Sequence, residues 1–352
     1  MQLAIAVAYE GAPFVSPNPL VGCTVVDRNH QLLATGYHAK YGADHAEVDA
    51  LKKLQIDELK NATLYVTLEP CAHEGKTSSC AKYIATLPVK KIVYGLMDPN
   101  PLVSGQGAQI LTNAGKTAVL YEGSLKSDLE DVCEVFLKNY REKKIFVAAK
   151  VASSLDGLIA LKSGESKWIT AEASREFVHE LRSRYDAIVV GRNTVEMDNP
   201  SLNIRHKKIT KQTQIIVIDP AGTLLRKIQS GSKFKFLEIH DAKNIFFITK
   251  EPEAKSEWQQ IKFSNLANLN QQLWTKGIRS VFIEGGALTY SSYLSAGLVD
   301  RLHLFMAPVI IGAQNGISWS QNFGIAQLEQ KLQLKNLKIK EFRPDIYMTG
   351  SL

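Results

Sequence analysis

Residues 45–80 carry the pattern that decides the fold class: HAEVDALKKLQIDELKNATLYVTLEPCAHEGKTSSC. Apolar residues recur at helical spacing over His45–Leu54, which predicts an amphipathic helix. The run Thr63–Leu68 predicts a strand, and Cys80–Leu87 predicts the next helix. Helix, strand and helix in succession indicate an α/β layer structure, in which helices bury the strands of a sheet.

The same alternation continues on both sides of this stretch. Gln2–Tyr9 is predicted to be a helix, and another is expected to run toward Tyr140. Ser127 and Glu130 have the spacing of a capping box that would open this later helix. Further strands are predicted at Cys23–Asp27, Leu32–Gly36 and Lys91–Leu96.

Two domains are expected from the length. The chain has 352 residues, whereas a single core rarely grows past ~250–300 residues. The charged segment REKK is predicted to join a first domain, residues 1–141, to a second, residues 145–352. The second domain begins a new α/β series, with a helix over Thr170–Arg184 that has Thr170 as its N-cap. Its last strands, Arg301–Ile311 and Leu337–Leu352, are expected to be antiparallel.

Composition and charge exclude several classes of protein. Hydrophobic residues make up 45% and charged residues 22%, as in ordinary globular proteins. No apolar run reaches the ~18–20 residues of a membrane helix, and the N-terminus lacks the basic region of a signal peptide. Four cysteines are too few for a disulfide scaffold. We therefore expect a cytoplasmic protein that does not bind a membrane.

The net charge of +7 is compatible with either a nucleic acid or an anionic small molecule as partner. The basic clusters RHKKITK and KLQLKNLKIK are not interleaved with aromatic residues, as a single-strand binder would require. We therefore expect a small-molecule substrate and no nucleic-acid partner.

One histidine and two cysteines of the quoted stretch form a candidate metal site. His45, Cys71 and Cys80 offer an imidazole and two thiolates, a set that suits Zn²⁺ and leaves a fourth position for water. Glu47 can move a proton from that water to a leaving amine. Residues i and i+2 diverge on a regular helix, so His45 and Glu47 converge only if the helix begins there.

Alternatives remain open at this site. The two cysteines can instead be small buried hydrophobes, which is our interpretation of Cys23 and Cys133. His73 is a rival ligand, although we favour a place for it in the lining of a pocket. Gly105-Gln106-Gly107 resembles the start of a dinucleotide-binding fingerprint, but the rest of that pattern is absent, so we predict a tight turn.

The motifs His45-Ala46-Glu47 and Pro70-Cys71 resemble those of zinc-dependent nucleobase deaminases. Most members carry P-C-x-x-C, whereas eight residues separate Cys71 from Cys80. This longer loop is similar to that of the pyrimidine deaminases of riboflavin biosynthesis, although Lys76 stands where that family usually has arginine. The segments SPNPLVG, residues 16–22, and DPNP, residues 98–101, match the same family. The resemblance implies that Asn18 contacts the substrate.

The rest of the chain resembles the reductase domain that is fused to those deaminases. The matching motifs are Val151–Gly157 (VASSLDG), Ser163–Thr170 (SGESKWIT), Val190–Val195 (VGRNTV), Asp198–Pro200 (DNP), Ile283–Gly286 (IEGG) and Gly297–Asp300 (GLVD). The resemblance thus covers nearly the whole chain. It implies an α/β fold with a cytidine-deaminase-like α/β/α layer domain first and a dihydrofolate-reductase-like α/β domain second.

The same resemblance implies a set of reductase site residues. Contacts with NADPH are expected from Ser153, Trp168, Thr194, Asp198, Gly286, Ala287, Leu288 and Thr289. Contacts with the substrate are expected from Ser166, Arg182, Leu202, Arg205 and Glu284. From the residues themselves, the Gly-Gly pair before a helix can hold a pyrophosphate on free N–H groups. Thr194 is placed at a second strand-to-loop junction, and Asp198 is the candidate general acid for reduction.

The function implied is that of a bifunctional enzyme of riboflavin biosynthesis. The first domain would deaminate 2,5-diamino-6-(5-phosphoribosylamino)pyrimidin-4-one. The second would reduce the ribosyl group of the product with NADPH to give 5-amino-6-(5-phosphoribitylamino)uracil. A homodimer or higher homo-oligomer is the family expectation.

Two other functions are considered. A zinc nucleic-acid deaminase of the tRNA type with an accessory domain predicts P-C-x-x-C, which this chain lacks. An inactive deaminase-like regulatory module predicts the loss of a ligand or of Glu47, and both are present.

Overall fold

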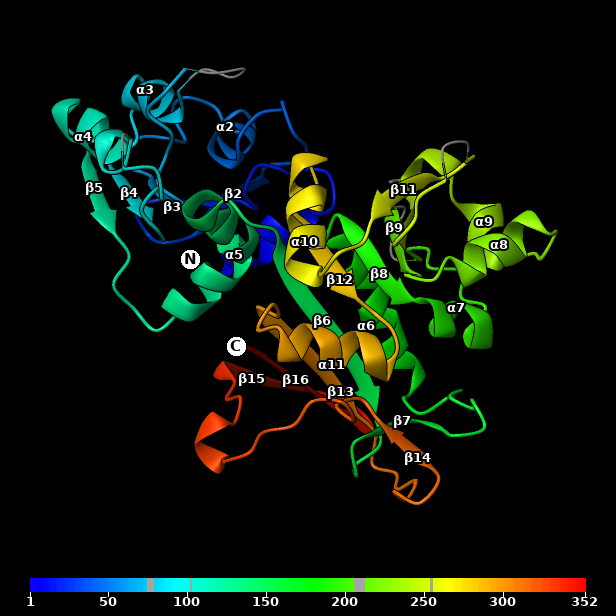
Figure 1. Cartoon of the computed structure of the whole chain (residues 1–352). Helices are drawn as coiled ribbons and strands as arrows, with labels where there is room; N and C mark the ends of the chain where they lie inside the picture. The colour runs from blue at the N-terminus through cyan, green and yellow to red at the C-terminus, as the bar shows by residue number, and fades with distance from the viewer. Residues whose placement is uncertain (75–78, 102, 206–212, 254–255) are drawn as a thin grey trace. The chain divides into compact units, whose positions relative to one another are not determined.

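The computed structural model describes residues 1–74, 79–101, 103–205, 213–253 and 256–352. It divides into two compact units, Met1–Lys143 and Lys144–Leu352. Figure 1 shows the first unit in blue to teal and the second in green to red. Within the described ranges no helix has both the length and the apolarity to cross a membrane.

The first unit is a five-stranded sheet in the order β2-β1-β3-β4-β5. β1 pairs antiparallel with β2 and β3, whereas β3, β4 and β5 are parallel. The strands are β1 Gly22–Val26, β2 Leu32–Tyr37, β3 Thr63–Val66, β4 Lys91–Tyr94 and β5 Thr117–Leu120. The helices are α1 Gln2–Ala8, α2 Ala46–Leu51, α3 Cys80–Ala85, α4 Gln106–Asn113 and α5 Lys126–Glu142, with a 3₁₀ turn at Tyr9–Gly11.

Helices cover both faces of this sheet, because alternate strand residues are apolar on each side. Leu64 and Ile92 pack with residues of α2 and α3 in one core, which also holds Cys23. Ala8 packs with residues of α5, including Cys133, in a second cluster. Cys23 and Cys133 are thus buried in apolar cores, as interpreted from the sequence.

Gly36 allows α2 to lie directly against β2. A Cβ atom at this position would come within 2.4 Å of the carbonyl oxygen of Ala46 and of the backbone nitrogen of Ala50. Any larger residue would push the start of α2 away from the sheet. The glycine therefore contributes to the position of His45, which immediately precedes this helix.

The predicted capping box at the start of α5 is wrong. The helix begins at Lys126, with Leu125 as N-cap and no capping hydrogen bond from a side chain. Ser127 therefore lies inside the first turn, where its hydroxyl cannot take the role of an N-cap. This hydroxyl is buried and has no hydrogen-bond partner among the described residues.

The second unit is a nine-stranded sheet in the order β11-β10-β9-β8-β12-β6-β13-β16-β15. The strands from β11 to β13 in that order are parallel, and β16 pairs antiparallel with β13, which confirms the predicted antiparallel finish. The predicted single strand Leu337–Leu352 is instead a hairpin of β15 and β16, because the chain turns at residues 343–344. The strands are β6 Phe146–Ser153, β8 Ala187–Gly191, β9 Gln214–Ile218, β10 Ile245–Thr249, β11 Gln259–Lys262, β12 Ser280–Ile283, β13 Arg301–Met306, β15 Lys335–Phe342 and β16 Asp345–Ser351. A separate two-stranded sheet pairs β7 Leu158–Leu161 with β14 Gly316–Ser318.

Helices bury both faces of the parallel strands. They are α6 Glu172–Ser183, α7 Arg192–Asp198, α8 Thr223–Gln229, α9 Lys235–Ile239, α10 Leu266–Thr275 and α11 Ala287–Ser295, with 3₁₀ turns at Ala242–Asn244 and Leu328–Gln330. One core includes Val281 and Tyr290, and another includes Val217 and Phe236. Because β6, β8 and β12 are parallel neighbours, their C-terminal ends meet at one edge, where ligands of open α/β sheets bind.

The N-cap of α6 differs from the prediction. Ala171, not Thr170, is the N-cap. The carboxylate of Asp345 accepts hydrogen bonds from the N–H of Ala171 at 2.7 Å and from the hydroxyl of Ser174 at 2.6 Å. The helix start is therefore stabilised by a residue at the beginning of β16, far away in the sequence, which local spacing cannot reveal.

Candidate active sites

His45 and Glu47 lie close together at the N-terminus of α2. His45 is the N-cap and has an extended backbone, with φ −74° and ψ 163°, while Glu47 lies in the first helical turn. The change from extended to helical backbone between them removes the divergence expected on a regular helix. This confirms the predicted placement at a helix N-terminus.

His45, Cys71 and Cys80 bring their donor atoms together. Nδ1 of His45 lies 3.5 Å from Sγ of Cys71 and 3.3 Å from Sγ of Cys80, and all three donors lie within 4.8 Å of one another. A tetrahedral zinc ion, with Zn–N of about 2.0 Å and Zn–S of about 2.3 Å, holds nitrogen and sulfur ligands about 3.5 Å apart. The donor set and its spacing therefore fit zinc. His73 is not part of this cluster.

The surroundings shift the proton affinities of these groups. A hydrogen bond with the Cys80 side chain, followed by those from His45 and from the Cys80 N–H, lowers the pKa of Cys71 to about 4. The same bond with Cys71 and burial raise the pKa of Cys80. Burial, with a further contribution from Cys71, raises the pKa of Glu47 to about 7. This carboxyl group therefore holds its proton far more tightly than an exposed glutamate.

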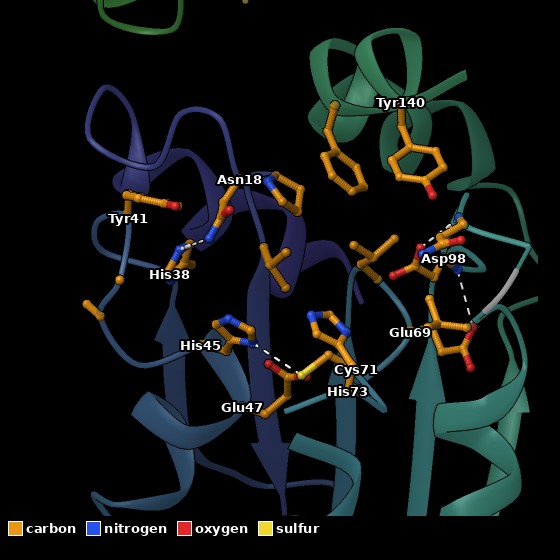
Figure 2. Close-up of a pocket in the computed structure, with 18 residues that line it drawn as sticks. Asn18, His38, Tyr41, His45, Glu47, Glu69, Cys71, His73, Asp98 and Tyr140 are labelled. Atoms are coloured by element: carbon orange, nitrogen blue, oxygen red, sulfur yellow. Dashed lines mark hydrogen bonds between the residues drawn. The ribbon is translucent and has the colours of Figure 1, made fainter. Parts of the chain in front are cut away.

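A pocket of about 440 Å³ opens onto this cluster. Figure 2 shows Asn18, His38 and His73 around the opening above Cys71. The side-chain amide of Asn18 lies 3.0 Å from Nε2 of His38, and Nδ1 of His38 lies 2.9 Å from the carbonyl oxygen of Asp44. The carbonyl can only accept, so Nδ1 of His38 carries the proton and Nε2 accepts from Asn18.

Glu69 was missed by the sequence analysis, and it ties three segments together. Its carboxylate accepts hydrogen bonds from the N–H groups of Asp98 at 3.2 Å, Gly105 at 2.9 Å and Ala108 at 3.2 Å. This anchors the DPNP segment and the start of α4 beside the Pro70-Cys71 turn. Its partners lie 29 to 39 residues away in the sequence, so no local pattern reveals this role.

The glycines at 105 and 107 are explained by backbone geometry. Gly105 has φ +80° and is the N-cap of α4, in agreement with the predicted turn. A Cβ atom on Gly107 would lie 2.0 Å from the carbonyl oxygen of Pro70, so a glycine is required for close packing. Both glycines thus allow α4 to begin close to the Pro70-Cys71 turn.

In the second unit, Thr194 lies against the predicted Gly-Gly turn. A Cβ atom on Gly285 or Gly286 would lie 2.7 Å or 3.1 Å from its Oγ1. Thr194 is on α7 and not at a strand-to-loop junction, so that part of the prediction is wrong. Thr289 is also close, with its Oγ1 2.7 Å from a Cβ built on Gly191 and 3.9 Å from one built on Gly286.

Gly286 is the N-cap of α11, with φ +78° and no side-chain cap. The amides of the first turn, which include Ala287 and Leu288, therefore have no side-chain acceptor among the residues that the structure describes. Free amides beside the hydroxyls of Thr194 and Thr289 fit the phosphates of a dinucleotide.

The structure brings Ser166 and Asp198 together. The hydroxyl of Ser166 donates to the carboxylate of Asp198 at 2.7 Å, and Lys167 donates to the Asp198 carbonyl at 3.1 Å. Trp168 is 71% exposed, and the guanidinium of Arg175 lies 4.6 Å from its ring centroid. Ser153 is buried at the C-terminal end of β6.

Arg182 and Glu284 form a buried ion pair. Arg182 Nη2 donates to Glu284 Oε2 at 2.9 Å, its Nε donates to Oε1, and Lys150 Nζ lies 3.4 Å from Oε2. Burial raises the pKa of Glu284, but the charges of Arg182 and Lys150 outweigh it and the net shift is downward. Glu284 is therefore held as a carboxylate.

The loop that follows α7 contributes the remaining predicted residues. The carbonyl of Asn203 accepts from Arg182 Nη1 at 2.7 Å, and Arg205 contacts the ring of His179 on α6. The side chain of Leu202 is only 3% exposed and packs in the core, so only its backbone can face a ligand. Lys76, and Lys207 and Lys208 of the basic cluster RHKKITK, lie outside the described residues.

Family models match both units. Residues 1–96 match the cytidine and deoxycytidylate deaminase zinc-binding region, and residues 145–348 match the RibD C-terminal domain. The riboflavin biosynthesis protein RibD of Actinobacillus pleuropneumoniae is 37% identical over 341 residues, which cover 95% of this chain and 90% of that protein. The chain belongs to the RibD family.

Solved structures agree with this assignment. Acinetobacter baumannii RibD is 35% identical, with a TM-score of 0.83 over 100% of this chain and 97% of that chain. A Thermotoga maritima deaminase/reductase is 32% identical, with a TM-score of 0.85 and the same coverage. The RibD family consists of bifunctional enzymes of riboflavin biosynthesis with a zinc-binding deaminase domain and an NADPH-dependent reductase domain. The alternative of a nucleic-acid deaminase is not favoured.

Proposed function

We propose that residues 1–141 catalyse the deamination and residues 145–352 the reduction. The Thermotoga maritima structure is a diaminohydroxyphosphoribosylaminopyrimidine deaminase/5-amino-6-(5-phosphoribosylamino)uracil reductase. By analogy, the substrate of the first reaction is 2,5-diamino-6-(5-phosphoribosylamino)pyrimidin-4-one. The donor cluster of His45, Cys71 and Cys80, with Glu47 buried beside it, is the observation that carries this proposal.

In the deaminase site, His45, Cys71 and Cys80 would hold the zinc ion. When bound, zinc lowers the pKa of a coordinated water toward ~7. Glu47 takes a proton from the attacking water and returns it to the 2-amino group, so that the C2–N bond breaks and ammonia leaves. Asn18 and His38, fixed by their mutual hydrogen bond, orient the pyrimidine in the pocket.

In the reductase site, the amides from Gly286 to Thr289 and the hydroxyl of Thr194 would bind the phosphates of NADPH. When bound, NADPH would supply the hydride for reduction of C1′ of the ring-opened ribosyl group. Asp198, oriented by Ser166, delivers the accompanying proton, so that one hydride and one proton complete the reduction. Arg182, Arg205 and Glu284 position the substrate.

The test is an assay of the full chain on the diaminopyrimidine nucleotide. Zinc-replete enzyme should release ammonia from this compound and then oxidise NADPH. Single-stranded nucleic acid, offered under the same conditions, should give no ammonia. Ammonia release from the nucleic acid alone would overturn the proposal.

A homodimer is also proposed, through the β15–β16 edge of the second unit. Leu337 and Ile339 are 52% and 63% exposed on β15. Ile339 pairs with Met348 on β16, and Glu341 pairs with Ile346, which is 39% exposed. These side chains share one sheet face, and such apolar exposure is typical of an interaction surface. Analytical ultracentrifugation should give a dimer for the full chain and a shift toward monomer for Ile339→Lys.

A cytoplasmic location is proposed on the basis of the thiols. All four cysteines are free. Free thiols are typical of a reducing compartment, and the proposed zinc site needs Cys71 and Cys80 in this form.

A further inference from the structure

His179 lies between two arginines that the proposed function places at the substrate. It is on α6, one turn before Arg182, and is 8% exposed. Arg205 donates its backbone N–H to Nδ1 of His179 at 3.1 Å and its Nε–H to Nε2 at 3.4 Å. Arg205 Nη2 also lies 3.2 Å from Nε2, and Arg182 Nη1 lies 3.4 Å from Nδ1. Both ring nitrogens therefore face N–H donors, and the carbonyl of Asn203, which also faces the ring, already accepts from Arg182 Nη1 at 2.7 Å.

These contacts cannot all be satisfied at once. Burial and the charges of Arg182 and Arg205 lower the pKa of His179 to about 4, so the ring is neutral at pH 7. A neutral imidazole has one acceptor nitrogen and one N–H group. Arg205 can therefore donate a hydrogen bond to only one of the two ring nitrogens. At the other nitrogen, an N–H group of Arg205 faces the N–H group of the ring.

The backbone contact is the one that persists. It is the shorter of the two and is fixed by the chain, whereas the arginine side chain can rotate. The ring proton then resides on Nε2, where it points toward the guanidinium of Arg205. A guanidinium and an imidazole N–H that face each other are both satisfied when an anionic oxygen binds between them.

The charges nearby leave Arg205 as the group available to an anion. Arg182 is already paired with Glu284 in a bidentate ion pair. Within the described part of the chain, the recorded side-chain partner of Arg205 is the His179 ring and not a carboxylate. Planar guanidinium groups bind phosphate through two parallel hydrogen bonds.

We propose that His179 is a positioning residue of the reductase site: Nδ1 holds the backbone of Arg205, and Nε2–H joins the Arg205 guanidinium in binding a phosphate monoester. We assign this phosphate to the substrate rather than to the 2′-phosphate of NADPH. The inference rests on the proposed role of Arg205 in substrate binding. It adds a residue to the site and names the chemical group of the substrate that the site recognises.

The kinetic test compares His179→Asn with His179→Leu in the full chain. Asparagine keeps an acceptor near the position of Nδ1 but has no N–H at the position of Nε2, and leucine loses both. The KM for 5-amino-6-(5-phosphoribosylamino)uracil should rise about tenfold in His179→Asn, the scale of one lost hydrogen bond to a charged group, and further in His179→Leu. The kcat and the KM for NADPH should stay within about twofold, since the reacting atoms are untouched.

Two further variants separate the possible outcomes. Glu180→Gln is the matched control on the same helix, because Glu180 pairs with Arg184 and not with the site, and it should leave KM unchanged. Arg205→Gln tests the proposed function itself. If Arg205→Gln raises KM and both His179 variants do not, the role of His179 is overturned. If Arg205→Gln leaves the KM for the substrate unchanged, the proposed role of Arg205 fails instead. If these variants change only the KM for NADPH, the assignment of the phosphate to the substrate is overturned.

A measurement on the unaltered protein avoids dependence on the folding of variants. Long-range ¹H–¹⁵N spectra of histidine-labelled enzyme report which ring nitrogen is protonated, and the signals absent in His179→Asn assign this residue. Nε2 should carry the proton at pH 7, and its signal should shift when inorganic phosphate is added. A proton on Nδ1, or no response to phosphate, overturns the inference.

Discussion

The two candidate sites are built in different ways. The deaminase cluster takes its donors and its proton carrier from the short stretch between His45 and Cys80, at the starts of two helices and in the loop that follows β3. The reductase site gathers residues from Lys150 to Thr289 at one edge of a parallel sheet. The first site can be recognised from a local sequence motif. The residues of the second site are far apart in the sequence and come together only in the folded sheet. Substitutions should therefore affect the two reactions independently.

The largest effect is expected from Glu47→Gln. The amide has the same shape but cannot carry the proton, and the loss of a general acid–base group costs ~10²–10⁴-fold in rate. Ammonia release should fall by at least this amount, while zinc content and NADPH oxidation on the deaminated substrate stay normal. Glu58→Gln, on an exposed residue of the same unit, is the control. A variant with a tenth of the normal deamination rate would exclude Glu47 as the proton carrier.

Cys80→Ser should remove zinc and deamination together. The enzyme should bind about one zinc ion per chain, and metal analysis of the variant should show most of it lost. The fall in deamination should exceed the ~10–100-fold that is typical for the loss of a residue behind the ligands. Cys133→Ser is the matched control, because this thiol is buried away from the cluster. Full zinc content in Cys80→Ser would identify another ligand, with His73 as the first candidate.

Asp198→Asn tests the reductase side of the comparison. Reduction should fall about 10²-fold, the usual scale for a general acid, while ammonia release is unchanged. The variant keeps an oxygen that can accept from Ser166, so the loop geometry is retained. An equal loss of NADPH affinity and rate would indicate a cofactor-positioning role instead. An unchanged rate would remove Asp198 from the site.

The comparison also explains what the sequence could and could not reveal. The donor cluster, the helix starts at His45 and Cys80 and the antiparallel finish of the second sheet follow from local patterns, and the structure agrees with them. Glu69 and His179 were missed because their partners are distant in sequence or belong to the backbone. Thr194 was placed in the wrong kind of element because a short helix follows β8 directly.

Acid should weaken the second unit through His179. Its pKa is about 4 in the folded protein and 6.5 for an ordinary histidine. Below pH 6.5 the unfolded chain binds a proton that the folded unit does not, so stability falls between pH 6.5 and about 4 and is unaffected above. His179 can lower the free energy of unfolding by at most about 3 kcal/mol over this pH range. All four tryptophans lie in this unit, so urea unfolding followed by their fluorescence measures it. His179→Asn should make this fall less steep, and the rest belongs to His240 and His303, whose pKa values are also lowered by burial. An equally steep fall in the variant would assign the whole effect to those groups.

The smallest effect is expected at the start of α6, where a distant residue replaces the cap predicted from local sequence. Asp345→Asn keeps the shape of the side chain but weakens the hydrogen bonds to Ala171 and Ser174, and should lower the free energy of unfolding by about 1 kcal/mol, the scale of a lost helix cap. Thr170→Val is the matched control, because it removes a hydroxyl at nearly constant volume. If Thr170 were the cap, Thr170→Val would lower the free energy of unfolding by the same amount as Asp345→Asn. The observed geometry predicts instead that Thr170→Val changes it by no more than about 0.5 kcal/mol. Urea unfolding of both variants at pH 7 decides between a local and a long-range origin of this helix start.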